Sequence, residues 1–500
     1  MYKLLLCLRY LRTRYIALAS IVSVMLGVAT MIVVNSVMAG FQDEMNRRLH
    51  GILSDLVVES HGTEGIANPI ELMEDIRDTL GDDVVAMTPN IHIPSMLSFE
   101  IRGEWVTKPI TLIGIDTATY SGVSDFSKFL LHPRNREQLE FRLREGGFGS
   151  RLEPAGFDYR RRRVAAEIAY QSKIDAMTAS PTELVNKDHT GGDPFMRLAP
   201  EAPSLEAMMA PHTGIVLGIS IASIRQRDEE GEVADYFLRR PGDDVRLTFP
   251  TASIPPELAN QYCTVVDFYE SKMSEYDANF AFVPLDNLQS MRGMIDPQTG
   301  IGAATAIQIR LAEGANLELA RDRLRAKYPP HLFPYRVQSW KDMQGPLLAA
   351  VQMETTLLNI LLFLIIAVAG FGILATFFMI VVEKTKDIGI LKSLGASSHG
   401  IMSVFVTYGF SLGIVGSGVG VVLGLTFVVH INRIAALIEM VTGREVFDPT
   451  IYYFQRIPTI IHGFTVGWIM VGAILIAVMA SVLPALRAAR LHPVEALRYE

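Results

Sequence analysis

Residues that commonly carry catalysis or bind metals are scattered along this chain of 500 residues and form no familiar motif. The sequence has eleven histidines and two cysteines, and it lacks a G-x-x-x-x-G-K-[ST] phosphate loop, an H-E-x-x-H pair and a C-x-x-C pair. His399, His430 and His462 fall at the ends of long apolar runs, a position typical of side chains at a membrane interface. We therefore predict no catalytic site, no metal site and no cofactor in this chain.

The stretch Val381–Gly400 instead has the pattern of an interaction site, and it separates two long uncharged apolar runs. Thr385 is placed to cap a short helix, because its hydroxyl can accept a bond from a free backbone N–H. Asp387 would lie in the first turn and Lys392 in the last, as the helix dipole favours. Gly395 then offers a left-handed end. The pattern predicts a helix of about nine residues.

One face of this predicted helix is apolar, since Ile388, Leu391 and Leu394 recur at i, i+3 and i+6. Nothing in the adjoining sequence covers such a face. A helix lying on the lipid surface and a helix inserted in a groove of another protein would both show this pattern. Asp387 and Lys392 would be charges at the rim of the docking face in the second case. The residues alone leave both interpretations open.

Four runs without Asp, Glu, Lys or Arg are long enough to span a membrane, which requires about 20 apolar residues. The first is too long for a secretory signal and predicts an uncleaved signal anchor. We assign transmembrane helices to residues 15–42, 355–382, 401–430 and 459–485.

Basic residues orient these helices. The excess of Lys and Arg lies in three segments, so all three are predicted to be cytoplasmic. They are the short amphipathic lead-in at residues 1–14, the loop 383–400 and the tail 486–500. The chain's net charge of −8 then leaves about −14 on the outside segments, almost all of it between the first two spans. An acidic outer domain argues against nucleic acid or anionic lipid as its partner. Cys7 inside and Cys263 outside could not pair.

The predicted fold class is an α+β membrane protein, with a large extracytoplasmic α+β domain, residues 43–354, inserted between the first two transmembrane helices. Two β-α-β patterns, in residues 55–87 and 306–337, predict a ferredoxin-like porter module closed from both ends of the domain. Short strands predicted between them indicate a β-rich lobe. Residues 132–212, rich in Gly, Pro and Arg, are predicted to be a mobile solvated loop, with a partner-binding appendage as the alternative. The segment 431–458 is predicted to be a second outside loop.

Glycines at intervals of four mark the third predicted span, where small residues let helices approach closely. Whether the neighbouring helix belongs to this chain or to a partner is open. The residues are Gly409, Gly413, Gly416, Gly420 and Gly424.

Two motifs carry a resemblance to a known group of proteins. EKTKDIGILKSLGAS at 383–397 and LPALRAARLHPVEALRYE at 483–500 resemble the MacB/FtsX-like permease superfamily, and the second is most similar to its lipoprotein-releasing (LolC/LolE) family. The resemblance implies an ABC transporter permease of the bacterial inner membrane, with its large domain in the periplasm. It also implies a separate ATPase subunit that binds ATP and a second permease chain, which is either the same as this chain or related to it. A lipoprotein substrate and a soluble periplasmic carrier are implied as well. The ATPase would dock on the coupling helix at Asp387, Ile388, Leu391, Lys392, Leu394 and Gly395.

Two other branches of the superfamily remain as alternatives. Efflux permeases of the MacB type usually carry their ATPase ahead of the first span, where this sequence has only fourteen residues. Regulators of the FtsX type, which pass a mechanical signal to a cell-wall hydrolase, usually have a much smaller outer domain.

Overall fold

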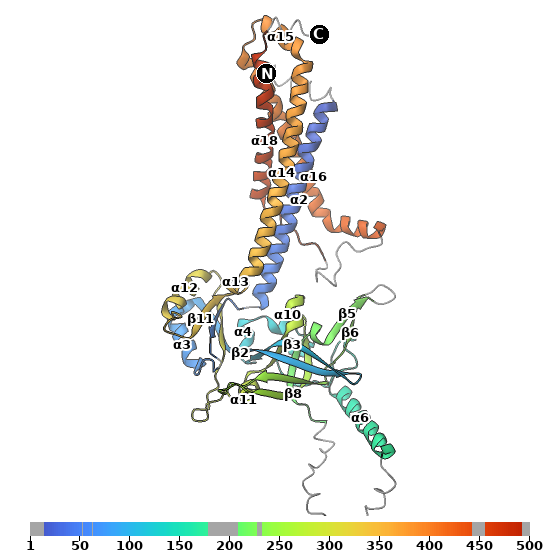
Figure 1. Ribbon diagram of the computed structural model, residues 1–500, viewed down its shortest axis with the longest axis vertical. Helices are drawn as coiled ribbons and strands as arrows, with labels where there is room; N and C mark the ends of the chain where they lie inside the picture. The colour runs from blue at the N-terminus through green and yellow to red at the C-terminus, as the bar shows by residue number, and fades with distance from the viewer. Residues whose placement is uncertain are drawn as a thin grey trace, which may run out of the picture. The chain divides into compact units, whose positions relative to one another are not determined.

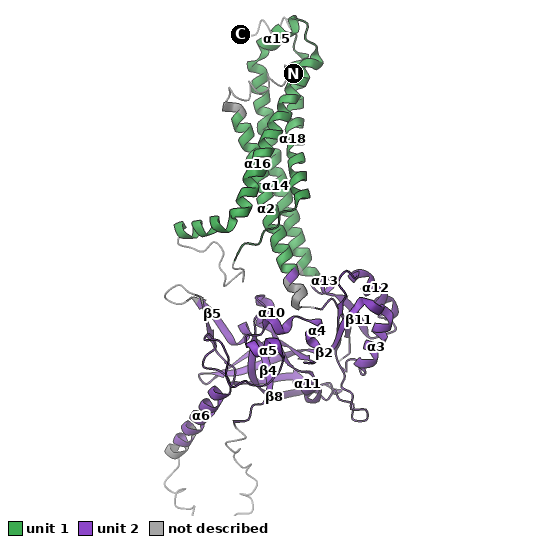
Figure 2. Ribbon diagram, turned by 180° about the vertical axis from the view of Figure 1, so that it is seen from behind, with its two compact units in different colours: residues 1–46, 345–500 green, residues 47–344 purple. Residues whose placement is uncertain are grey.

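The computed structural model describes residues 15–52, 54–62, 64–178, 209–227, 233–442 and 456–492 (Figure 1). The chain divides into two compact units (Figure 2). One comprises residues 1–46 and 345–500, and the other comprises residues 47–344. The division follows the composition, since the first unit contains the apolar helices and the second contains the strands.

Four helices of the first unit each contain a stretch long and apolar enough to cross a membrane, as predicted. They are α2 (Tyr15–Ile52), which runs on into the second unit, α14 (Gly345–Glu383), α16 (Ser398–Thr442) and α18 (Gly463–Arg490). The short helix α15 (Thr385–Ser393) connects α14 to α16. Helix α16 continues past the predicted end at residue 430, because no Pro or Gly interrupts residues 430–442. The predicted outside loop therefore begins as helix, and its residues 443–455 lie outside the described residues.

Four strands of the second unit lie in the order β11-β1-β10-β2, with every neighbouring pair antiparallel. Helices α3 and α12 supply buried stripes, including Leu72, Ile76 and Leu324, to a core shared with these strands. Asn68 caps α3 by accepting a bond of 3.3 Å from the Glu71 N–H. Both predicted β-α-β patterns are thus present. The elements are β1 (Leu56–Ser60), α3 (Pro69–Leu80), β2 (Val84–Ile101), β10 (Ala306–Leu311), α12 (Leu317–Lys327) and β11 (Tyr335–Ser339).

Strand β2 has 18 residues and joins this four-stranded part to a second group of strands. The sequence pattern predicts two separate strands here, at 84–87 and 96–101, and the structure joins them into one. The second group closes on itself, since β7 pairs with β2 at residues 96–98. Six strands consequently form a ring around a core of its own, in the order β2, β3 (Glu104–Ile115), β9 (Phe280–Pro284), β4 (Thr213–Gly218), β8 (Leu258–Tyr269) and β7 (Asp244–Pro250).

Smaller elements lie beside both groups of strands. Strands β5 and β6 form a separate two-stranded hairpin. Helix α13 begins with a capping box, in which the side chains of Ser339 and Asp342 each accept a bond from the other residue's backbone N–H. The remaining elements are α4 (Tyr120–Val123), α5 (Pro133–Glu137), α6 (Phe157–Thr178), α9 (Ile219–Ala222), β5 (Ser223–Arg227), β6 (Val233–Phe237), α10 (Ser274–Asn279), α11 (Leu285–Arg292) and α13 (Trp340–Met343), with 3-10 turns at Gly81–Asp83 and Phe126–Phe129.

The prediction of a mobile solvated loop at 132–212 is wrong for residues 132–178, which include α5 and α6. The backbone N–H of His132 and the side-chain amide of Asn135 donate to the buried carboxylate of Asp267. Arg160 is 1% exposed and donates to Asp244 at 2.6 Å and to the Gly242 carbonyl at 3.2 Å. Such a buried cation is tolerated because it is ion-paired and hydrogen-bonded. Residues 179–208 lie outside the described residues.

Candidate coupling site and packing of the membrane helices

Helix α15 ends as predicted and begins one residue earlier than predicted. Gly395 has a φ of +93°, and the N–H groups of Gly395 and Ala396 donate to the carbonyls of Lys392 and Leu391, both at 3.0 Å. This pair of bonds is the Schellman ending that glycine permits. The predicted cap at Thr385 is wrong, since Lys384 is the N-cap residue. The Thr385 hydroxyl instead donates to the Val381 carbonyl at 2.9 Å, because α15 follows α14 almost without a break.

The predicted apolar face of α15 divides into a buried and an exposed part. Ile388 is 4% exposed and belongs to the core of the helix bundle, whereas Leu391 is 52% and Leu394 is 80% exposed. Ile390, which the sequence pattern did not single out, is 48% exposed. The prediction that Ile388 shares an exposed face with the two leucines is therefore wrong. Steps of three residues drift around a helix of 3.6 residues per turn, so Ile388 points well away from Leu394.

The two charged residues of α15 have different surroundings. Asp387 accepts a hydrogen bond from Lys384 at 2.6 Å, and its side chain is half-exposed. Lys392 is not a free rim charge, because its Nζ donates to the carbonyl oxygens of Ala489 at 2.6 Å and Leu491 at 2.8 Å. A lysine suits the unsatisfied carbonyls at the end of a helix, here α18. Lys392 thus ties α15 to α18, a contact across some 97 residues that no local pattern could predict.

A cavity of about 580 Å³ opens beside this contact. It is lined by Lys392 of α15, His399 and Met402 of α16, and Leu486, Ala489 and Arg490 of α18. The exposed residues Ile390, Leu391 and Leu394 lie at the same end of the bundle. We call these three residues the α15 apolar face.

The five glycines of α16 pack against two helices of this same chain. A Cβ at Gly409 would lie 2.6 Å from Ser481 of α18, and Gly413 also faces α18. A Cβ at Gly420 would lie 2.8 Å from the Met25 carbonyl oxygen of α2, and Gly416 and Gly424 face α2 as well. Within this chain, the five glycines therefore lie close to α18 and α2. One glycine stripe serves α18 over its first half and α2 over its second.

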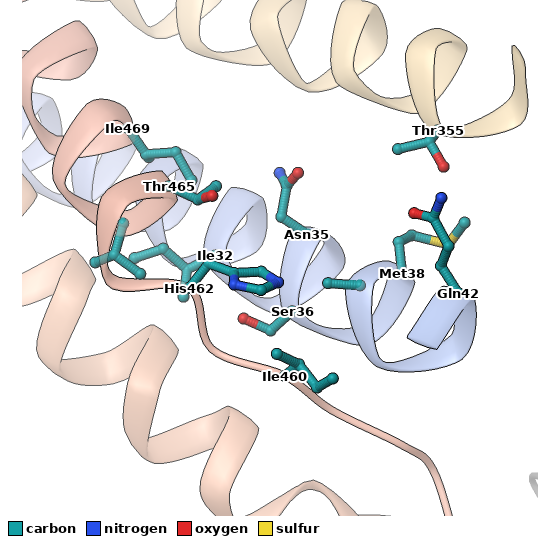
Figure 3. A pocket seen from close by; sticks show the side chains of 12 residues that line it. Ile32, Asn35, Ser36, Met38, Gln42, Thr355, Ile460, His462, Thr465 and Ile469 are labelled. Atoms are coloured by element: carbon teal, nitrogen blue, oxygen red, sulfur yellow. The ribbon is translucent and has the colours of Figure 1, made fainter. Parts of the chain in front are cut away.

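A second cavity, of about 220 Å³, lies between α2, α14 and α18. Figure 3 shows Asn35 and Gln42 of α2, Thr355 of α14 and Thr465 of α18 around it, with His462 at the start of α18. Asn, Gln, Thr and His side chains therefore gather around this cavity. Within the described ranges, no group of three or more His, Cys, Asp or Glu side chains could hold a metal ion.

Comparison with known proteins identifies the region that contains α15. The model of the family "FtsX-like permease C-terminal" matches residues 359–493, which include most of α14 and all of α15, α16 and α18. The chain carries an FtsX-like permease domain. The α15 apolar face and the glycine stripe both lie within this permease domain.

Curated relatives agree with the permease domain. The lipoprotein-releasing system transmembrane protein LolC of Xylella fastidiosa is 33% identical over 241 residues, 47% of this chain and 55% of the relative. LolE of Haemophilus influenzae is 30% identical over 226 residues, 45% of this chain and 52% of the relative. An uncharacterized ABC transporter permease of Bacillus subtilis, YknZ, is 26% identical over 226 residues, 45% of this chain and 51% of the relative. The chain spans about half the length of these relatives, and the predicted resemblance to the LolC/LolE family is confirmed.

Proposed function

We propose that this chain is the membrane subunit of an ABC transporter of the LolC/LolE type, which releases lipoproteins from the bacterial inner membrane. A separate ATPase would bind and hydrolyse ATP, and a second permease chain and a soluble periplasmic carrier would complete the system. The observation that carries the proposal is the α15 apolar face, exposed at one end of an FtsX-like permease domain. The names of the LolC and LolE relatives support the lipoprotein substrate.

We also propose that residues 47–344 are the periplasmic domain. The order β11-β1-β10-β2, with α3 and α12 packed on the strands, supports the ferredoxin-like module predicted from the sequence. The six-stranded ring corresponds to the predicted β-rich lobe. On this proposal the domain handles the lipoprotein outside the membrane.

The proposed orientation predicts a difference in labelling by a membrane-impermeant maleimide. Thr299→Cys should react on intact spheroplasts, and Ser393→Cys should react only after permeabilisation, since both side chains are exposed but on opposite membrane faces. Cys7→Ser and Cys263→Ala provide the background. Cys263 is buried, and burial raises the pKa of its thiol to about 12, so a residual signal from it is not expected. Equal labelling at both positions before permeabilisation would reject this orientation.

The proposed docking of the ATPase predicts that Leu391→Asp abolishes co-purification of the ATPase subunit and release of lipoprotein. Leu391 is half-exposed, so the charge should not disturb the fold of the free chain. In a docked complex the charge would be buried, and apolar anchors of interfaces typically cost about 2 kcal/mol or more even when truncated to alanine. Affinity purification of the ATPase with each variant, followed by an assay of lipoprotein release, measures the loss.

Ser393→Asp is the matched control, because Ser393 is exposed on the same helix but is not part of the α15 apolar face. This variant should retain the ATPase. If Leu391→Asp bound the ATPase at the wild-type level, α15 would not be the docking element. A helix that only lies on the lipid surface would give that result.

A further inference from the structure

The last part of α16 differs from the rest of the helix in direction and surroundings. The end of the helix turns sideways and runs away from the bundle instead of along it, as both views show (Figures 1 and 2). Three of its aliphatic side chains are exposed, Leu437 by 62%, Ile438 by 42% and Val441 by 79%, and Ile434 is half-buried. Four aliphatic residues recur at i, i+3, i+4 and i+7, which places them on one side of the helix. We call Ile434, Leu437, Ile438 and Val441 the α16 end stripe.

The opposite side of this helix end is held by the chain itself. The side-chain amide of Asn432 donates to the Ile457 carbonyl at 3.3 Å, and its oxygen accepts from the Ile457 N–H at 2.8 Å. At 100° per residue, Asn432 points away from the α16 end stripe. Residues 456–460 therefore hold the side of the helix that bears Asn432, and Leu437, Ile438 and Val441 are exposed among the described residues.

Contacts of residues 458 and 460 with α2 show how far along the bundle the end of α16 lies. The Ile460 N–H donates to the Ser36 carbonyl of α2 at 2.9 Å, and the Pro458 carbonyl lies against Gly40. The uncharged run of α2 ends just beyond, since the next charged residue is Asp43. The α16 end stripe thus begins where the apolar part of the bundle gives way to its polar part.

We propose that residues 434–442 lie in the lipid–water interface of the bilayer, with the α16 end stripe inserted among the acyl chains. Phospholipid would then cover the stripe, in the membrane leaflet on the side where α2 and α14 connect to residues 47–344. Amphipathic interfacial helices bury their apolar side by roughly 5–10 Å at the boundary of headgroups and acyl chains. The stripe also continues an exposed apolar surface of α16, since Leu423 and Phe427 are exposed and lie in line with it at 100° per residue.

A second copy of the chain fits the stripe less well. Stable protein interfaces bury about 800 Å² on each partner. Four aliphatic side chains on two turns of helix offer only a fraction of that area. The proposal rests on the membrane-spanning helices of the proposed function, and it depends neither on the ATPase nor on the transported substrate.

Fluorescence quenching in vesicles tests the proposal with the full chain. Single cysteines at Ile438 in the stripe and at Ala436 on the opposite side, in the background without Cys7 and Cys263, would carry a bimane label. The vesicles would be phosphatidylcholine containing nitroxide-labelled phosphatidylcholine. We expect the lipid nitroxide to quench the label at Ile438 at least twofold more than the label at Ala436, and aqueous iodide to show the reverse order.

Leu364→Cys, on the exposed surface of α14, is the control for insertion of the bundle. Quenching by lipid at Leu364 but not at Ile438 would overturn the interfacial helix and leave the proposed function standing. A label at Ile438 that neither quencher reaches would also overturn it, since a protein partner would then cover the stripe. If the lipid nitroxide quenched neither the label at Leu364 nor the label at Ile438, the insertion of the helix bundle into the membrane would be rejected.

Discussion

Ile388→Asp is expected to prevent the helix bundle from folding, although the sequence pattern places Ile388 on the same helix face as Leu391. The side chain is 4% exposed and shares the bundle core with Val381, Ile401 and Ala485. An unpaired carboxylate there would cost several kcal/mol, a large part of the 5–15 kcal/mol that separates typical folded and unfolded proteins. Fluorescence-detected size-exclusion chromatography in detergent would report aggregation or loss of the monodisperse peak.

Ile390→Asp is the matched control for this variant. The residue type is the same, the helix is the same, and Ile390 is 48% exposed. It should give the wild-type elution profile and thermal stability. Equal stability of the two variants would mean that α15 does not pack against the bundle as described. The comparison also shows why Ile388→Asp is unsuitable for the ATPase co-purification experiment. Loss of the ATPase by this variant would report misfolding and not a lost contact.

Gly420→Leu is expected to destabilise the bundle by separating α16 from α2. A Cβ at this position would lie 2.8 Å from the Met25 carbonyl oxygen and 2.9 Å from the Val28 Cβ, and neither is the flexible end of a side chain. Overpacking a close contact typically costs about 1–3 kcal/mol. Helices in lipid depend on close packing for association, since burial from water contributes little there. A clear fall in the midpoint of thermal unfolding in detergent is the expected result.

Gly418→Leu controls for the change of residue type. Gly418 lies two residues away on the same helix, and a Cβ there would meet no atom within 4 Å. Its unfolding midpoint should stay close to that of the wild type. If both leucines lowered the midpoint equally, the effect would come from altered helix propensity or lipid contact, and the glycine stripe would not be a packing surface.

Features with a local cause were predictable from the sequence. The four apolar helices follow from uncharged runs, and α3 follows from the Asn68 cap and the spacing of Leu72, Ile76 and Leu80. The left-handed end at Gly395 follows from a residue that tolerates a positive φ. In each case the physical determinant lies within a few residues of the structure that it specifies.

Features that depend on distant contacts were not predictable. Lys392 has the position of a rim charge in its own helix, and only the end of α18 shows that it is a tether. Arg160 belongs to a run of four arginines, a pattern that predicts an exposed segment. In the structure its side chain is buried and bonds to Asp244 and to the Gly242 carbonyl, more than 80 residues away. Ile388 was misassigned because a face of a short helix cannot be assigned to core or surface without its neighbours.

The sharing of β2 by two groups of strands has a mechanical consequence. Strand β10 pairs with residues 84–90 of β2 and β3 pairs with residues 90–101, so the two groups of strands are joined by successive lengths of one continuous strand. An extended backbone is close to its full length and has little slack. A pull on the four-stranded part should therefore pass to the ring along β2, and any bend between the two is expected near Asn90, the residue that is paired on both sides.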